Sequence, residues 1–125
     1  VPALENYILE FAEQTGIDCD LAVQPKEMAL EAEKKTAVFR IAQEALLNVA
    51  QHAGARHVMI NLSRRDETVM LDISDDGRGF AEDSDTPRPA YGIMGMRERA
   101  LALGGSLDVR AESGRGTRVI ANIPV

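Results

Sequence analysis

The sequence is organised around residues 75–80, Asp-Asp-Gly-Arg-Gly-Phe, which directly follow a strand pattern. Val69, Leu71 and Ile73 share one side of this run, and Asp72 and Ser74 point to the other, as in a β-strand with one buried face. The alternation ends at Asp75, and two glycines follow, Gly77 and Gly79. Glycine accepts positive φ angles and lets a ligand approach the backbone closely. A carboxylate at a strand end beside such glycines can bind a group that donates hydrogen bonds.

The amino group of an adenine ring suits the Asp75 carboxylate. That group donates a hydrogen bond, whereas guanine presents a carbonyl oxygen there, which a carboxylate repels. A well-formed hydrogen bond to a charged group contributes about 1.5–3 kcal/mol. Two simpler interpretations remain open for these six residues alone. Asp-Asp-Gly is a common turn sequence, and residues 72–83 partly match a calcium-binding loop, which however needs flanking helices and ends in Glu rather than Asp83.

The composition indicates an ordinary globular domain. The chain has 125 residues, 45% hydrophobic and 27% charged, enough for one core. Its net charge of −6 and the lack of any long basic run argue against nucleic-acid binding. No apolar run approaches the length of a membrane span, so we expect no direct membrane contact. The single cysteine, Cys19, excludes an internal disulfide and a multi-cysteine metal cluster.

The order of patterns predicts an α+β fold over residues 1–125. We expect a two-layer α/β sandwich, with a mixed, mostly antiparallel sheet of about five strands on three helices, rather than a purely parallel sheet. Residues 81–91 read as a polar loop. The strands at 57–63 and 68–74 form a predicted antiparallel hairpin. Helices are predicted at 3–15, 31–53 and 92–103, and the other strands at 17–24, 106–110 and 117–123.

The long helix carries a polar trio, Glu44, Asn48 and His52, at intervals of four residues. In an α-helix these three spread over roughly 80° of one side. They flank an apolar arc, so all three can reach into one cavity. The trio suits a magnesium–phosphate site, because an Asn oxygen can ligate Mg²⁺, His can donate to phosphate, and Glu can accept a proton. A solvated helix flank is the simpler alternative.

Two glycine-containing stretches complete the pattern. Gly92 and Gly95 lie where the loop is predicted to enter a helix, and free amides at a helix N-terminus bind phosphate oxygens. The stretch is neither a P-loop nor a Rossmann fingerprint. Gly116-Thr117 opens the last strand, where the threonine can support Asp75 through hydrogen bonds or a shared water. A plain helix junction and a plain hairpin turn are the respective alternatives.

Together these four motifs resemble the N box, G1 box, G2 box and terminal Gly-Thr of the histidine-kinase ATP-binding domain. Here they are Glu44 to Ala53, residues 75–80, Gly92 to Met96, and Gly116-Thr117. That domain belongs to a superfamily shared with gyrase, the mismatch-repair clamp protein and a heat-shock chaperone. The resemblance covers residues from about 3 to 125. Residues 92–100, Gly-Ile-Met-Gly-Met-Arg-Glu-Arg-Ala, with Gly104-Gly105 after them, are similar to the sensor kinases related to the nitrate sensors.

The resemblance implies a Bergerat-type ATP-binding fold and a role for each motif. Asp75 would bind the adenine amino group, Asn48 would hold Mg²⁺, and Glu44 would be the catalytic base or orienting group. Residues 81–91 would form the ATP lid. The other residues implied to contact ATP are His52, Ala53, Gly77, Gly79, Phe80, Tyr91, Gly92, Ile93, Met94, Gly95, Met96 and Thr117.

The resemblance also implies a reaction and partners. The domain would transfer the γ-phosphoryl of Mg-ATP to a histidine on a separate upstream dimerisation domain, for two-component signal transduction. The phosphate would pass to a response regulator with a helix-turn-helix output. Neither His52 nor His57 matches the family's phosphoacceptor histidine, so we expect this chain to be only the catalytic half of the kinase. We also expect it to be cytoplasmic and to form a homodimer only through the separate dimerisation domain. Two alternatives stay open: an anti-sigma-factor serine kinase of the same fold, and a nucleotide-binding interaction module without turnover.

Overall fold

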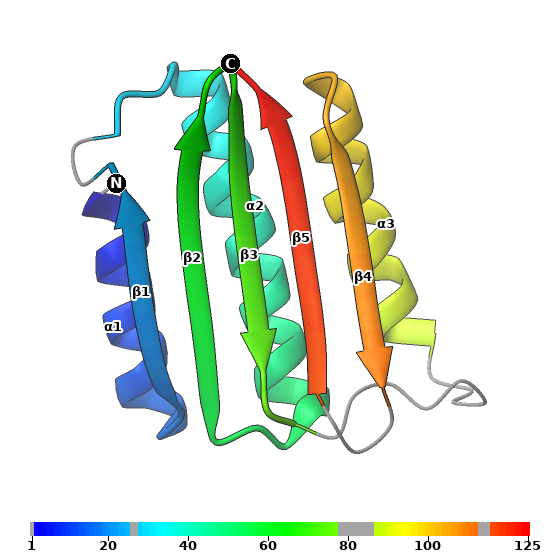
Figure 1. Cartoon of the computed structure of the whole chain (residues 1–125). Helices are drawn as coiled ribbons and strands as arrows, with labels where there is room; N and C mark the ends of the chain where they lie inside the picture. Colours follow the sequence, from blue (N-terminus) through cyan, green and yellow to red (C-terminus); the bar gives the residue numbers. More distant parts are fainter. Residues whose placement is uncertain (1, 26–27, 78–86, 113–115) are drawn as a thin grey trace.

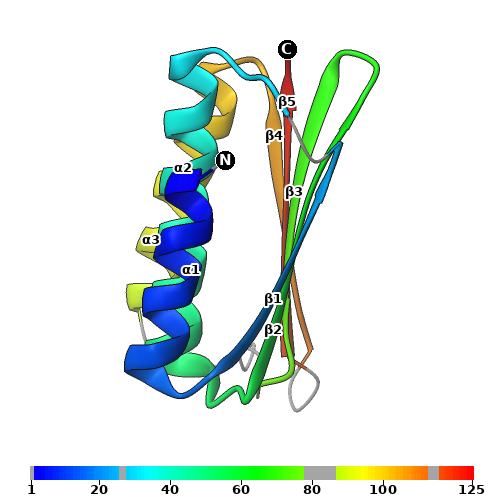
Figure 2. The ribbon, with the colours of Figure 1, turned by 90° about the vertical axis from the view of Figure 1, so that its left-hand side faces the viewer.

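In the part of the chain that is described, three helices cover one face of a five-stranded sheet, and no helix lies on the other face (Figures 1 and 2). This computed structural model describes residues 2–25, 28–77, 87–112 and 116–125. For residues 52, 53, 87–91, 111 and 112 it describes the backbone only. The arrangement confirms the predicted α+β two-layer sandwich.

The sheet is mixed, as predicted. Its strand order is β1-β2-β3-β5-β4; β1 pairs with β2 in parallel, and the other neighbours are antiparallel. The predicted hairpin is β2 and β3. The strands are β1 (Asp18–Gln24), β2 (His57–Arg65), β3 (Thr68–Asp75), β4 (Ser106–Glu112) and β5 (Gly116–Pro124). The helical elements are α1 (Pro2–Thr15), α2 (Ala32–Asn48), a π-helical turn η1 (Val49–Ala53) and α3 (Pro87–Ala102).

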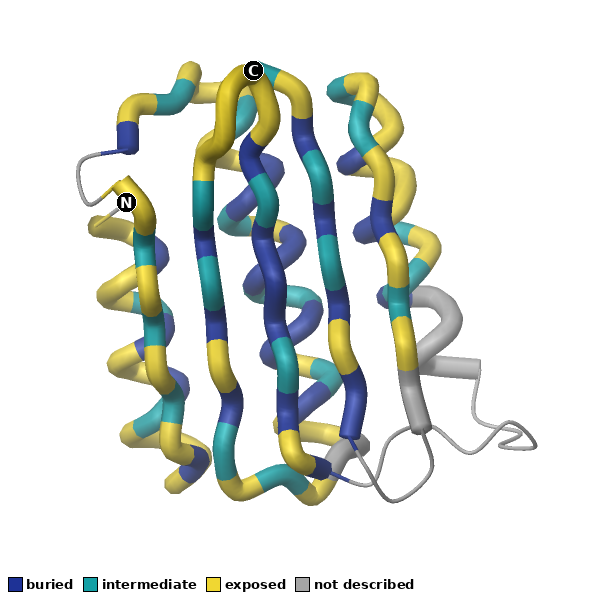
Figure 3. Tube along the Cα trace, viewed as in Figure 1, coloured by how far each residue is buried: buried dark blue, intermediate teal, exposed yellow. Residues whose placement is uncertain are grey.

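The core lies between the two layers and matches the predicted periodicities. On β3 the alternating residues Val69, Leu71 and Ile73 are buried. The central strands β3 and β5 are buried along much of their length, whereas the edge strands β1 and β4 are more exposed (Figure 3). Each fully buried aliphatic side chain contributes about 1.5–3 kcal/mol. The helices contribute Leu4, Ile8 and Phe11 from α1 and Ala37, Val38, Ile41, Ala42, Ala45 and Leu46 from α2.

The helix predicted to run from 31 to 53 changes its geometry inside the motif. Regular α-helix ends at Asn48, and one π-helical turn continues to Ala53 before Gly54, at φ 61°, ends the element. A π turn has i→i+5 hydrogen bonds and often occurs at functional sites. The 100° spacing therefore holds between Glu44 and Asn48 but not on to His52. The prediction that all three lie on one regular helical line is wrong for His52.

The last helix begins at Pro87 rather than at residue 92, so the predicted loop 81–91 is wrong for residues 87–91. Residues 81–86 lie outside the described residues. Proline fits the first turn of a helix, where the backbone N–H has no partner within the helix. Only the first four amides of a helix are free in this way. The amides of Gly95 and Met96 are therefore internal to α3, and the prediction of free phosphate-binding amides there is wrong.

One ion pair orders the sheet face that no described helix covers. Asp72 on β3 is 7% exposed, although it points to the polar side of its strand as predicted. Arg118 on β5 donates to both of its carboxylate oxygens, Nε at 3.0 Å and Nη2 at 2.6 Å. A bidentate pair of this kind is geometrically specific. It ties β3 to the strand that opens with Gly116 and Thr117.

Candidate functional site

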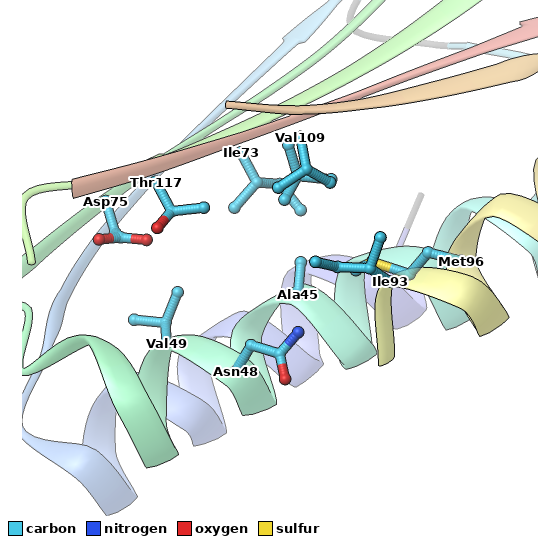
Figure 4. A pocket seen from close by; sticks show the side chains of 10 residues that line it. Ala45, Asn48, Val49, Ile73, Asp75, Ile93, Met96, Val109 and Thr117 are labelled. Atoms are coloured by element: carbon cyan, nitrogen blue, oxygen red, sulfur yellow. The ribbon is translucent and has the colours of Figure 1, made fainter. Parts of the chain in front are cut away.

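A small cavity of about 20 Å³ lies between the two layers, where β3 and β5 face α2 and α3 (Figure 4). Three polar side chains enter an otherwise apolar lining: Asp75 and Thr117 from the sheet, and Asn48 from α2 opposite. Such a lining, apolar with a few oriented polar groups, is typical of a small-molecule site. The apolar residues are Ala45, Val49, Ile73, Ile93, Met96, Val109 and Val119.

Asp75 is only 8% exposed at the end of β3. The backbone amide of Gly77 donates to its Oδ1 at 2.8 Å. Burial raises the pKa of Asp75, the backbone hydrogen bonds from Gly77 and Thr117 oppose that shift, and the nearby charge of Asp76 adds to it. The net direction is upward. Thr117 thus contacts Asp75 through its backbone, and the contact of its hydroxyl that the sequence suggested stays a prediction.

Gly116 explains why the last strand opens with glycine. Its φ is +92°, a conformation that side chains rarely adopt. A Cβ there would also collide with the carbonyl oxygen of Asp75 and lie 3.3 Å from the Cα of Asp76. The backbone of β5 therefore touches the backbone of the Asp75–Asp76 segment. This close approach brings Thr117 into the cavity wall beside Asp75.

Gly92 is the point where α3 meets the polar side chains of α2. A Cβ on Gly92 would lie 2.7 Å from Glu44 Oε1 and 3.2 Å from Asn48 Nδ2. The missing side chain leaves the space that both groups occupy. A Cβ on Gly95, in contrast, would meet nothing within 4 Å. The two glycines of the motif therefore do different things, which their sequence spacing alone does not reveal.

A more open, polar groove continues from the cavity and shares Asn48 and Met96 with it. Glu44 lies in this groove, one helical turn from Asn48. The groove also contains two arginines that the sequence analysis missed, Arg40 on α2 and Arg99 on α3. Arg40 precedes Glu44 by four residues, and residues at this spacing lie on the same face of a helix. This spacing could have identified Arg40 from the sequence. The groove is lined by Arg40, Gln43, Glu44, Asn48, Gln51, Gly92, Gly95, Met96 and Arg99.

Other predicted site residues fall into two groups. The side chain of Met94 is 56% exposed and lines neither hollow, whereas Ile93 and Met96 line the cavity. The predicted contacts through Gly79 and Phe80 lie outside the described residues, as do the side chains of His52, Ala53 and Tyr91.

The donors at the junction of cavity and groove fit a magnesium ion bound with a nucleotide. Mg²⁺ usually takes only one or two protein oxygens and completes its shell with phosphates and water. The Asn48 amide and the Glu44 carboxylate, both beside Gly92, offer such oxygens. Within the described residues no group of three or more His, Cys, Asp or Glu residues gathers around a common point, so a metal site made of protein ligands alone is not found there.

The sequence and the fold of this chain match known proteins. Residues 33–125 match the family described as "Histidine kinase-, DNA gyrase B-, and HSP90-like ATPase". The chain belongs to this ATPase family. Over its whole length the chain is 34% identical to the signal transduction histidine-protein kinase/phosphatase DegS of Brevibacillus brevis. It is 38% identical over 112 residues (90% of the chain) to the signal transduction histidine-protein kinase/phosphatase UhpB of Salmonella typhimurium, and 28% over 123 residues (98%) to the oxygen sensor histidine kinase NreB of Staphylococcus carnosus.

The chain spans about a third of the length of DegS and NreB and a fifth of UhpB (32%, 35% and 22%). Among solved structures, the ATPase-family fold is shared with the histidine kinase domain of the blue-light activated histidine kinase EL346 of Erythrobacter litoralis. The TM-score is 0.77 at 25% identity, covering 97% of this chain and 58% of that one. The histidine kinase AdeS of Acinetobacter baumannii has the same fold, with a TM-score of 0.75 at 14% identity over 98% of this chain and 61% of that one. No described helix is long and apolar enough to span a membrane.

Proposed function

We propose that residues 1–125 form the ATP-binding catalytic domain of a sensor histidine kinase. One observation carries the proposal: Asn48 lines both the mostly apolar cavity, which contains the buried carboxylate of Asp75, and the polar groove, which contains Glu44. We assign the adenine ring to the cavity, whose walls must move apart to admit it, and the chain of phosphates to the groove. The names of DegS, UhpB and NreB support a histidine acceptor over the serine acceptor of an anti-sigma kinase.

Each residue has a distinct role in this proposal. The ionised Asp75 accepts a hydrogen bond from the adenine amino group, and Ile93 and Met96 cover the base. The Asn48 oxygen holds Mg²⁺, which when bound neutralises charge on the β- and γ-phosphates. Further nucleotide contacts are assigned to His52, Ala53, Gly77, Gly79, Phe80, Tyr91 and Thr117.

The phosphoryl transfer itself requires one proton acceptor. The imidazole nitrogen of the incoming histidine forms a bond to the γ-phosphorus as the bond to the β,γ-bridging oxygen breaks, and ADP leaves. Glu44 orients the imidazole and accepts its proton, because the groove places its carboxylate one turn beyond Asn48. Arg40 and Arg99 supply positive charge at the far end of the groove. Most of the catalysis in such a site comes from positioning and charge neutralisation.

The proposal extends to partners and place. The acceptor histidine lies on a separate dimerisation domain, through which the full protein forms a homodimer. A response regulator with a helix-turn-helix output receives the phosphate from that histidine. We place the domain in the cytoplasm, where ATP is abundant, without nucleic-acid or direct membrane contacts.

Calorimetry with ATP and GTP tests the binding half of this proposal. We expect a clear preference for ATP and a large loss of ATP affinity in Asp75→Asn, because an amide cannot replace the charged acceptor fully. Equal affinity for the two nucleotides would refute the adenine assignment. Transfer of radiolabel from ATP to the acceptor domain of the parent protein tests the catalytic half. ATP binding without any transfer would instead support an interaction module that does not turn over.

A further inference from the structure

Asp76 has no role in the proposed function, yet its side chain accepts two backbone hydrogen bonds beside the cavity. Its Oδ1 accepts the backbone amide of Arg56 at 2.8 Å and that of His57 at 3.0 Å. Its own amide donates to the carbonyl oxygen of His57 at 3.2 Å. One residue after the end of β3 is therefore tied by three hydrogen bonds to the beginning of β2. Hydrogen bonds to a charged acceptor are about twice as strong as neutral ones.

The backbone that Asp76 binds is itself held in place. The carbonyl oxygen of Arg56 accepts the amide of Asp18 at 2.9 Å. The imidazole Nε2 of His57 lies 2.7 Å from Asp20 Oδ2. Both contacts fasten the start of β2 to the edge strand β1, with which it pairs in parallel. The attachment point of Asp76 is thus a corner of the sheet rather than a free loop.

The opposite side of the same segment is also confined. Gly116 at the start of β5 packs against the Asp75 carbonyl and the Asp76 Cα. The peptide that joins Asp75 to Asp76 therefore lies between β2 and β5, in contact with both. A rotation of this peptide would turn the Asp75 side chain relative to the cavity. A positioned carboxylate needs such support to keep productive geometry.

We propose that Asp76 is a positioning residue for nucleotide recognition: its carboxylate fastens the end of β3 to the start of β2 and thereby aims the Asp75 carboxylate at the base. This inference rests on the proposed function, in which Asp75 binds adenine. Asp76 itself lines neither the cavity nor the groove.

The charge of Asp76 provides an independent readout of this arrangement. The two amide hydrogen bonds lower the pKa of Asp76, whereas burial raises that of Asp75, and the Asp76 charge adds to that rise. Asp76 is therefore ionised over the range in which Asp75 gains its proton. Among the described residues, the other charged groups on this side of the sheet are Arg56, His57 and Asp20 near β1 and β2, and Arg118, paired with Asp72, on β5. His52 on η1 is described only in its backbone.

Two substitutions separate the hydrogen bonds from the charge. Asp76→Asn keeps an oxygen that can accept both amides, and Asp76→Ala removes it. Asp108→Ala and Asp108→Asn are the matched controls, because Asp108 is an exposed aspartate on the edge strand β4 with no role in the site. The measurements are calorimetric dissociation constants for Mg-ATP and Mg-GTP over a pH series, and thermal unfolding of each variant.

At neutral pH we expect Asp76→Ala to weaken ATP binding about tenfold or more and to reduce the preference for ATP over GTP, because the base-reading carboxylate is no longer aimed. Asp76→Asn should stay within about twofold of the wild type. Its loss of ATP affinity on acidification should move to lower pH, since removing the Asp76 charge lowers the pKa of Asp75. The Asp108 variants should change none of these quantities.

The proposal is overturned if Asp76→Ala retains wild-type ATP affinity and base preference while Asp75→Asn loses them. It is also overturned if a folded Asp76→Asn, which keeps an oxygen for both hydrogen bonds, loses ATP affinity tenfold or more. The second result remains decisive even if Asp76→Ala does not fold. The underlying adenine assignment would instead be refuted if the wild-type domain bound neither nucleotide. It would also be refuted if Asp75→Asn bound ATP as tightly as the wild type.

Discussion

Replacing Gly92 by alanine should separate stability from catalysis in this domain. The added Cβ would lie 2.7 Å from Glu44 Oε1 and 3.2 Å from Asn48 Nδ2, and real Cβ contacts are essentially never below 3.0 Å. The Glu44 carboxylate must therefore move. It is the far end of a flexible side chain in an open groove, so the movement is cheap for folding. The same displacement should slow phosphoryl transfer, because the Glu44 carboxylate must meet the incoming imidazole.

The expected stability change follows from helix propensity. Gly92 lies inside α3, where alanine is more favourable than glycine by about 0.8–1.0 kcal/mol. The displacement of Glu44 offsets part of this gain, so the free energy of unfolding should stay within about 1 kcal/mol of the wild type. Gly95→Ala, with no atom within 4 Å of the new Cβ, is the matched stability control and should show the full gain.

Phosphoryl transfer should fall in Gly92→Ala. A positioned acid or base typically contributes about 10²–10⁴-fold, and a displaced one retains only part of this. We expect a loss of roughly 10²-fold in transfer to the acceptor domain, with a smaller change in ATP affinity through Asn48. The assays are urea unfolding, nucleotide calorimetry and radiolabel transfer. Wild-type transfer in Gly92→Ala would refute the reasoning, provided that Glu44→Gln is inactive in the same assay.

Four further predictions concern the same site. Glu44→Gln should keep ATP affinity within a few-fold and lose most transfer, whereas Asn48→Ala should weaken Mg²⁺-dependent ATP binding; identical defects in calorimetry and transfer would contradict the separation of roles. Burial raises the pKa of Asp75, so the folded state favours its protonated form and stability is lost as pH rises through that raised pKa. Asp75→Asn should therefore unfold at higher urea than the wild type at neutral pH while binding ATP poorly, and a lower midpoint would count against this. Gly116→Ala should cost about 1–3 kcal/mol in urea unfolding, because its φ is strained for alanine and the Cβ strikes the Asp75 carbonyl; an unchanged midpoint would argue otherwise. Arg40→Gln should weaken binding of ATP more than of ADP if its charge acts on the terminal phosphate, and equal effects on the two nucleotides would exclude that role.

The local patterns of the sequence determined the architecture. Alternation from 69 to 74 placed Asp75 at a strand end, and apolar spacing on α1 and α2 identified their buried faces. The one-turn spacing of Glu44 and Asn48 placed both in one groove. These features depend on periods of 2 and 3.6 residues, which the chain carries within a few residues of each position.

The tertiary structure decided the features that depend on contacts between distant segments. The π turn after Asn48 and the start of α3 at Pro87 depart from the predicted boundaries, because helical geometry near a site depends on what packs against it. The sequence spacing of Gly92 and Gly95 could not show that only Gly92 meets Glu44. Asp76 read as part of a turn, and its hydrogen bonds to residues 56 and 57 exist only once β2 and β3 are paired. Each of these contacts joins residues that lie far apart in the chain, so no local pattern encodes them.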